Sequence, residues 1–117
     1  MKKDNILLTK SYSFALRIVK LNKALVKEDR EYVLSKQILR SGTSIGANSE
    51  EAVGAQSRKD FKHKLSIAYK EARETHFWIR LLRDSGYVEN QLSVSLLKDC
   101  DELLKIIGSI IKTLKKS

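Results

Sequence analysis

Proline is absent from this 117-residue sequence, which contains only one cysteine, Cys100, and five glycines. Proline marks turns and sheet edges and interrupts helices. A proline-free chain rich in leucine, isoleucine, lysine and glutamate therefore favours an all-helical fold. A single cysteine excludes a disulfide within the chain and fits a reducing compartment.

Long apolar runs are also missing, and this argues against two kinds of membrane segment. The basic start of the chain is followed by an apolar run at residues 6–8. That run is shorter than the roughly seven residues that a signal peptide needs. No stretch approaches the roughly 18 apolar residues of a membrane-spanning helix. We therefore expect a cytoplasmic protein without a membrane partner. At 42% hydrophobic and 32% charged residues, the chain is expected to form one globular domain over residues 1–117.

Apolar residues recur at helical spacing in four segments. The predicted helices cover about residues 5–27, 31 to 54 or 55, 58–83 and 90–115. Gly54 and Gly86 are expected to end the second and third helices, and Ser57 is expected to cap the start of the third. Amphipathic helices joined by short connections place neighbours antiparallel. The predicted fold class is all-α, an antiparallel up-down-up-down four-helix bundle.

Each predicted helix has an apolar face that we expect to form the core. On the first helix this face is Leu8, Tyr12, Ala15, Val19 and Val26, flanked by Leu16, Ile18 and Leu25. On the third it is Phe61, Leu65, Ala68, Ala72, Thr75, Ile79 and Leu82. On the fourth it is Leu96, Cys100, Leu103, Ile107, Ile110 and Leu114.

The second predicted helix is unusual because nine of the sixteen residues at 37–52 are Gly, Ala, Ser, Thr or Asn. A glycine inside a helix costs roughly 1 kcal/mol relative to alanine. We expect close packing of a neighbouring helix against Gly42 and Gly46 to offset that cost. The larger residues share one face, which consists of Leu34, Ile38, Ile45 and Ala52. The alternative is a flexible linker that divides the chain.

The third helix carries apolar side chains outside its core face, and we name this surface the Trp78 patch. Its members are Ile67, Glu71, Glu74, Phe77, Trp78 and Leu81. Exposed apolar patches are uncommon on monomers, and tryptophan is favoured at interfaces. The patch therefore predicts self-association. The alternative is that Trp78 covers the gap to the fourth helix.

No residue pattern indicates an enzyme, a cofactor or a metal. Carboxylate-bridged metal bundles need inward-facing Glu-x-x-His pairs, and the nearest match here is Asp60 with His63. His76 is interpreted as a boundary residue that makes one hydrogen bond. Cys100 lies on an apolar face and is interpreted as a core residue rather than a nucleophile. The glycines at 42 and 46 lack the lysine of a phosphate-binding loop.

The net charge of +9 is the remaining functional signal. Residues 1–30 carry a net +5 and residues 57–84 a net +4, whereas residues 31–56 and 85–117 carry −1 and +1. The candidate nucleic-acid-binding residues are Lys10, Arg17, Lys20, Lys27, Arg58, Lys59, Lys62, Lys70, Arg73 and Arg80. Such a surface attracts polyanions. The alternative is that these side chains only keep the protein soluble.

Three stretches resemble a bacterial four-helix-bundle family encoded in 23S rRNA intervening sequences. They read LRSGTSIGANSEEA at 39–52, AQSRKDF at 55–61 and AYKEARETHFW at 68–78. Many members carry proline in place of Gly46 and an apolar residue in place of Ser49. The resemblance implies antiparallel four-helix subunits assembled as a homopentamer. It also implies similarity to the accessory variability protein of diversity-generating retroelements, a basic pentamer that binds nucleic acid and a reverse transcriptase.

Two hypotheses follow for the function. In the first, the protein is a non-enzymatic oligomer that binds RNA or DNA, or acts as an adaptor, through its basic surface. In the second, it is an interaction scaffold that meets a protein partner such as a reverse transcriptase through the Trp78 patch or a ring face. The positive charge would then serve solubility alone.

Overall fold

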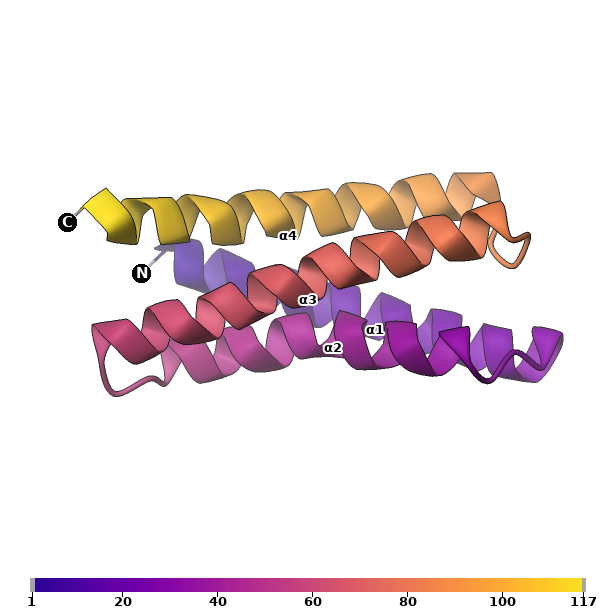
Figure 1. Cartoon of the computed structure of the whole chain (residues 1–117), viewed down its shortest axis with the longest axis horizontal. Coiled ribbons are helices and arrows are strands. Elements are labelled where there is room, and N and C mark those ends of the chain that lie inside the picture. The colour runs from indigo at the N-terminus through magenta and orange to yellow at the C-terminus, as the bar shows by residue number, and fades with distance from the viewer. Residues whose placement is uncertain (1, 117) are drawn as a thin grey trace.

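The computed structural model describes residues 2–116, with side chains from Asn5 onward, and forms four helices. They are α1 (Lys2–Asp29), α2 (Leu34–Val53), α3 (Arg58–Asp84) and α4 (Asn90–Lys116). Consecutive helices run antiparallel, in the order up, down, up, down (Figure 1). The predicted fold class is confirmed. Residues 1 and 117 of the predicted domain lie outside the described part of the chain.

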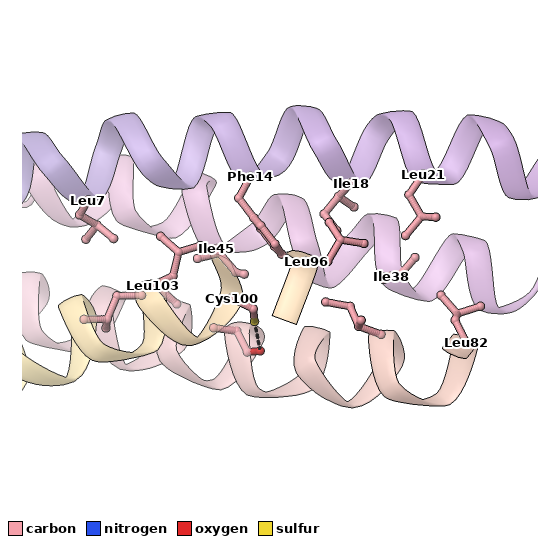
Figure 2. Close-up of a cluster of buried hydrophobic side chains, with 14 of the residues drawn as sticks. Leu7, Phe14, Ile18, Leu21, Ile38, Ile45, Leu82, Leu96, Cys100 and Leu103 are labelled. Atoms are coloured by element: carbon pink, nitrogen blue, oxygen red, sulfur yellow. Dashed lines mark hydrogen bonds between the residues drawn. The ribbon is translucent and has the colours of Figure 1, made fainter. Parts of the chain in front are cut away.

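Each helix packs against two neighbours, so that α1 contacts α2 and α4, while α3 contacts α2 and α4. The bundle is slender, with extents of 47 × 21 × 19 Å. Apolar side chains from all four helices meet along its axis, as Figure 2 illustrates with Phe14, Ile45, Leu82 and Leu103. The contact between α1 and α4 is the least extensive of the four.

The stretch rich in small residues is a continuous part of α2, so the linker alternative is wrong. A Cβ atom added at Gly42 would lie 2.8 Å from Cγ1 of Ile18 on α1. At Gly46 it would lie 3.4 Å from the carbonyl oxygen of Ser11. Both glycines are buried, and the predicted close approach of a neighbouring helix is confirmed. On the side facing α3, Thr75 Oγ1 donates to Ser41 Oγ at 2.9 Å, so this buried polar pair is satisfied.

The predicted core face of α1 is wrong by one residue, or about 100° around the helix. The buried row consists of Leu7, Ser11, Phe14, Ile18, Leu21 and Leu25. Tyr12 and Leu16, which we expected in or beside the core, are 66% and 56% exposed. The physical reason is the shape of α2. Gly42 leaves room for Ile18, and Gly46 brings the small side chain of Ser11 against α2.

The predicted core faces of the other helices are confirmed, with half-buried residues at their ends. Phe61 and Leu114 pack against the rim of the core on α3 and α4, and Leu34 does so on α2. Within the core, the Cys100 thiol donates to the Ala72 carbonyl oxygen at 3.2 Å, the hydrogen bond dashed in Figure 2.

The helix ends follow the predicted caps in most cases. Ser57 accepts from the backbone N–H of Asp60 at 3.0 Å, and Gly86 adopts a left-handed φ of +87°. Gly54 ends α2 without a left-handed backbone. The start of α2 lies later than predicted because the Glu31 carboxylate accepts from the Ser35 N–H at 2.7 Å and so caps the helix. Burial raises the pKa of Glu31, but backbone hydrogen bonds outweigh it and leave this pKa below its ordinary value.

Candidate nucleic-acid interface

The α3–α4 hairpin brings two basic segments side by side. In an antiparallel hairpin, residues at equal distances from the turn meet. Arg58 Nη2 donates to the Leu114 carbonyl oxygen at 3.1 Å, and His76 Nε2 lies 3.3 Å from Asp101 Oδ1. These contacts fix the register of the hairpin. Residues 58–70 therefore lie beside residues 103–116, at the end of the bundle where the chain terminates (Figure 1).

These two segments form the most strongly basic part of the protein, whereas residues 1–57 carry a net +4 and residues 71–102 a net −3. The two segments contain nine lysines and arginines and one carboxylate, that of Asp60, which gives a net charge of +8. We name the nine side chains the basic face: Arg58, Lys59, Lys62, Lys64, Lys70, Lys105, Lys112, Lys115 and Lys116. Lys64 is matched within the chain, since its Nζ lies 2.9 Å from Glu51 Oε1 on α2.

A groove of about 440 Å³ lies within the basic face, between α3 and α4. We name it the lysine groove, and its lining residues are Ser66, Tyr69, Lys70, Gly108, Ile111, Lys112 and Lys115. Three lysines from two helices therefore border one hollow. None of the described residues that line it carries a carboxylate, so no partner within the groove matches this charge.

Part of the lining of the lysine groove is apolar. Tyr69 and Ile111 are half-buried and pack against the core. Gly108 lies opposite the Tyr69 ring, where an added Cβ would be 3.6 Å from Cε1. Because glycine has no side chain, it leaves the Tyr69 ring uncovered on that side. The groove thus combines an aromatic wall with a cationic border.

The basic residues predicted on α1 behave in two ways. Lys10 Nζ lies 3.2 Å from Glu102 Oε2, and Arg17 Nη1 lies 2.6 Å from Asp99 Oδ2. These two cations bridge α1 to α4, so their charge is matched inside the chain. Lys20 and Lys27 are exposed and make no hydrogen bond or ion pair with the described residues.

Arg73 and Arg80 lie apart from the lysine groove, in the second half of α3. They border a hollow of about 270 Å³ together with His76, Asp101 and Leu104. Arg80 Nε donates to His76 Nδ1 at 3.1 Å. His76 is half-buried at the boundary, as predicted, but it has two polar partners rather than one. Asp101 offsets part of the positive charge here.

The Trp78 patch is only partly free. Trp78 packs against the core, and its Nε1 donates to Glu74 Oε2 at 2.9 Å. Arg40 on α2 pairs with Glu71 and with Glu74 in the same chain. Phe77 and Leu81 remain 47% and 37% exposed. The exposed part of the patch therefore reduces to these two side chains.

Sequence reasoning assigned no function to Lys112, Lys115 and Tyr69, although a usable signal was present. Residues 85–117 carry a net charge of only +1, but their acidic residues all precede position 103, and lysines are the only charged residues that follow it. In an antiparallel hairpin with its turn at 85–89, those lysines lie beside the basic start of the third helix. The net charge of a whole helix hides the difference between its two halves. The net charge of the residues at each end of the bundle shows it.

The chemistry of the remaining candidates is structural. Burial, followed by the nearby Asp101 and Asp99 carboxylates, raises the pKa of the Cys100 thiol to about 12. Cys100 is fully buried, as its interpretation as a core residue predicted. Within the described residues, no three His, Cys, Asp or Glu side chains gather closely enough to hold a metal ion. Among the described helices, none is both long and apolar enough to cross a bilayer.

Two comparisons with known proteins return a match, and one returns none. The family model described as 23S rRNA-intervening sequence protein matches residues 3–109. A crystal structure of a Bacteroides thetaiotaomicron protein, described as of unknown function and from the S23 ribosomal protein family, is 55% identical. The match covers 94% of this chain and 98% of that one, with a TM-score of 0.93. No curated protein matches. The family match covers most of the chain, and the chain therefore belongs to the 23S rRNA-intervening sequence protein family.

Proposed function

We propose that this chain is a non-enzymatic, oligomeric protein that binds nucleic acid through the basic face. The observation that carries the proposal is the concentration of charge. Residues 58–70 and 103–116 hold a net +8, whereas residues 1–57 hold +4 and residues 71–102 hold −3. Lysines that only keep a protein soluble can be spread over its whole surface and need not cluster at one end of a hairpin.

Electrostatics favours a polyanion over a single small anion as the ligand. The basic face extends along two adjacent helices, and only three of its nine side chains, Lys70, Lys112 and Lys115, border the lysine groove. A nucleic acid backbone presents repeated phosphates to such a surface. Each neutralised phosphate releases counterions, so binding should weaken steeply with salt.

Assembly into a homopentamer, as the family resemblance implies, would strengthen this binding. We propose that the subunits meet through Phe77 and Leu81 of the Trp78 patch. The apolar side chains of both residues are exposed to solvent in the single chain. These residues lie in the second half of α3, whereas the basic face occupies its first half. Several copies of the face in one ring would contact one strand together.

The test compares two variants that lose the same charge. The first replaces Lys70, Lys112 and Lys115 of the lysine groove with alanine. The second replaces Lys20, Lys23 and Lys27, three exposed lysines of α1, with alanine. Fluorescence anisotropy of a labelled RNA or DNA oligonucleotide at about 50 mM salt gives the affinity. Circular dichroism confirms that both variants keep the helical fold.

We expect the groove variant to bind at least about tenfold more weakly than wild type, because three phosphate contacts are lost. The α1 variant is expected to bind nearly as well as wild type. Equal losses in the two variants would mean that only total charge matters and would overturn the assignment to the basic face. No binding by the wild-type protein at about 50 mM salt would overturn nucleic-acid binding itself.

A second candidate function rests on the exposed apolar side chains Phe77 and Leu81. In this alternative the protein is a scaffold that meets a protein partner, such as a reverse transcriptase, and has no direct contact with nucleic acid. A protein partner that co-purifies after nuclease treatment and high salt, and is lost when both side chains are replaced by serine, would favour it. The wild-type oligonucleotide measurement above separates the two candidates.

A further inference from the structure

The lysine groove has features that phosphate binding alone does not require. A flat array of lysines would neutralise phosphates equally well on an open surface. This groove also has an aromatic wall from Tyr69, an apolar side chain from Ile111 and a glycine, Gly108, opposite the ring. Its volume of about 440 Å³ falls in the range of about 300–1,000 Å³ that is usual for small-molecule sites.

We propose that the lysine groove receives a base of single-stranded nucleic acid, with Tyr69 stacking on that base. Lys70, Lys112 and Lys115 hold the phosphates on either side of it. The inference rests on the proposed function and narrows its ligand to single strands. It assigns a binding role to Tyr69, Gly108 and Ile111, which carry no charge.

Single strands fit the groove better than duplexes for a steric reason. The faces of bases in a duplex are covered by their neighbours in the stack and cannot reach an aromatic side chain. A single strand can turn a base outward, and proteins that bind single strands commonly combine aromatic stacking with a cationic groove. Tyr69, Lys70 and two lysines of α4 line the same hollow, so both elements are present there.

Charge complementarity decides against other occupants. An apolar or cationic ligand would leave Lys70, Lys112 and Lys115 without counter-charges, since no carboxylate lines the described groove. An acidic peptide would match the lysines but would offer only carboxylate side chains to the Tyr69 ring. A nucleotide unit matches both, because its phosphate meets the ammonium groups and its base meets the ring.

Two substitutions isolate the aromatic wall from the charge. Tyr69→Leu keeps apolar bulk against the core but removes the ring, and Tyr69→Phe is the matched control that keeps it. Gly108→Leu covers the ring from the opposite side, and Gly108→Ala is its control. The alanine Cβ would lie 3.6 Å from Tyr69 Cε1, an ordinary contact. All four proteins retain every lysine, so their net charge equals that of wild type.

The measurement is the affinity for three probes with equal numbers of phosphates, namely a single-stranded oligonucleotide, its duplex and an abasic strand. We expect wild type to bind the single strand roughly 5- to 150-fold more tightly than the abasic strand, the range of one base stacked on an aromatic ring. Tyr69→Leu and Gly108→Leu are expected to lose that preference while still binding the abasic strand. Tyr69→Phe and Gly108→Ala are expected to keep it.

Two results would overturn the inference while leaving nucleic-acid binding intact. One is equal wild-type affinity for the single strand and the abasic strand. The other is a base preference that survives both Tyr69→Leu and Gly108→Leu in folded protein. Equal competition by a single strand and by polyglutamate of the same charge would also overturn it, in favour of an acidic peptide. Failure of all three probes to bind wild type at about 50 mM salt would overturn the proposed function as well.

Discussion

Gly42 and Ile18 determine how closely α1 approaches α2. A Cβ atom at position 42 would lie 2.8 Å from Cγ1 and 2.9 Å from Cγ2 of Ile18, which is fully buried. We predict that Gly42→Ala lowers the free energy of unfolding by about 1–3 kcal/mol, because overpacking outweighs the better helix propensity of alanine. Urea unfolding followed by circular dichroism measures the change.

Gly46→Ala is the matched control for that substitution. Its Cβ would lie 3.4 Å from the Ser11 carbonyl oxygen, at the edge of ordinary contact. We expect this variant to be as stable as wild type, or more stable by up to about 1 kcal/mol, because a helical glycine is replaced. If Gly42→Ala proved as stable as wild type, close packing of α1 on α2 would not explain the glycine at position 42.

Cys100 is expected to be chemically inert in the folded protein. Burial raises the pKa of its thiol from 9.0 to about 12, and only the thiolate reacts with thiol reagents. We predict negligible labelling of native protein at pH about 8, the range where free cysteines react, and complete labelling in denaturant. Rapid labelling of native protein would contradict the burial of this residue.

At the scale of single elements, the residue that follows α1 has an unusual backbone conformation. Arg30 has a φ of 52°, in the left-handed region, and the Glu31 N–H donates to the Leu25 carbonyl oxygen at 3.0 Å. Glycine is the usual residue at this position of a helix end. We predict that Arg30→Gly raises the free energy of unfolding by about 0.5–1 kcal/mol, since the strain on a side-chain-bearing residue disappears.

Lys27→Gly provides the contrast, because this exposed position lies within α1. There glycine is expected to lower the free energy of unfolding by about 1 kcal/mol. Chemical denaturation of the two variants and wild type tests the opposite signs. Destabilisation by both substitutions would argue against a left-handed backbone at position 30.

Three of the four core faces followed from periodicity, and α1 shows why the fourth did not. Its buried row contains Ser11, which interrupts the apolar pattern, whereas the adjacent row has Tyr12. Ser11 is tolerated in the core because it faces Gly46 and its hydroxyl donates to the Leu8 carbonyl oxygen at 3.3 Å. Both compensations come from tertiary structure and from the backbone, so periodicity within α1 could not reveal them.

The candidate site was predictable in part. Arg58, Lys59, Lys62 and Lys70 followed from the charge of the third helix, and the structure groups them with the lysines of α4. That grouping depends on hairpin register, which the turn position could have supplied. The ion pair between Lys10 and Glu102 forms because particular faces of α1 and α4 meet. The charge composition of the sequence does not reveal which faces those are.

At the scale of the whole molecule, the basic face lies at one end of the α3–α4 hairpin, and the exposed side chains Phe77 and Leu81 lie in the other half of α3. These two apolar side chains lead to a prediction about assembly. We expect wild-type protein to be a pentamer in multi-angle light scattering, and the double variant Phe77→Ser with Leu81→Ser to dissociate to smaller species. Trp78 is a poorer probe because it also packs against the core, so its loss would lower stability as well.

The exposed pair on α1, Tyr12 and Leu16, supplies the control for assembly. Replacing both with serine removes a comparable amount of exposed apolar surface, and the variant is expected to remain pentameric. If the α1 pair dissociated the oligomer and the α3 pair did not, the subunit interface would lie on α1. A monomeric wild-type protein would remove the ring and the additive phosphate contacts that it provides.

The most direct test of the central claim is the salt dependence of single-strand affinity. Each phosphate contact contributes about 0.7 to the slope of log affinity against log salt concentration. Replacing Lys70, Lys112 and Lys115 with alanine is therefore expected to reduce the magnitude of that slope by about 2 relative to wild type. The variant lacking Lys20, Lys23 and Lys27 is expected to retain the wild-type slope. Identical slopes for wild type and the groove variant would contradict the account.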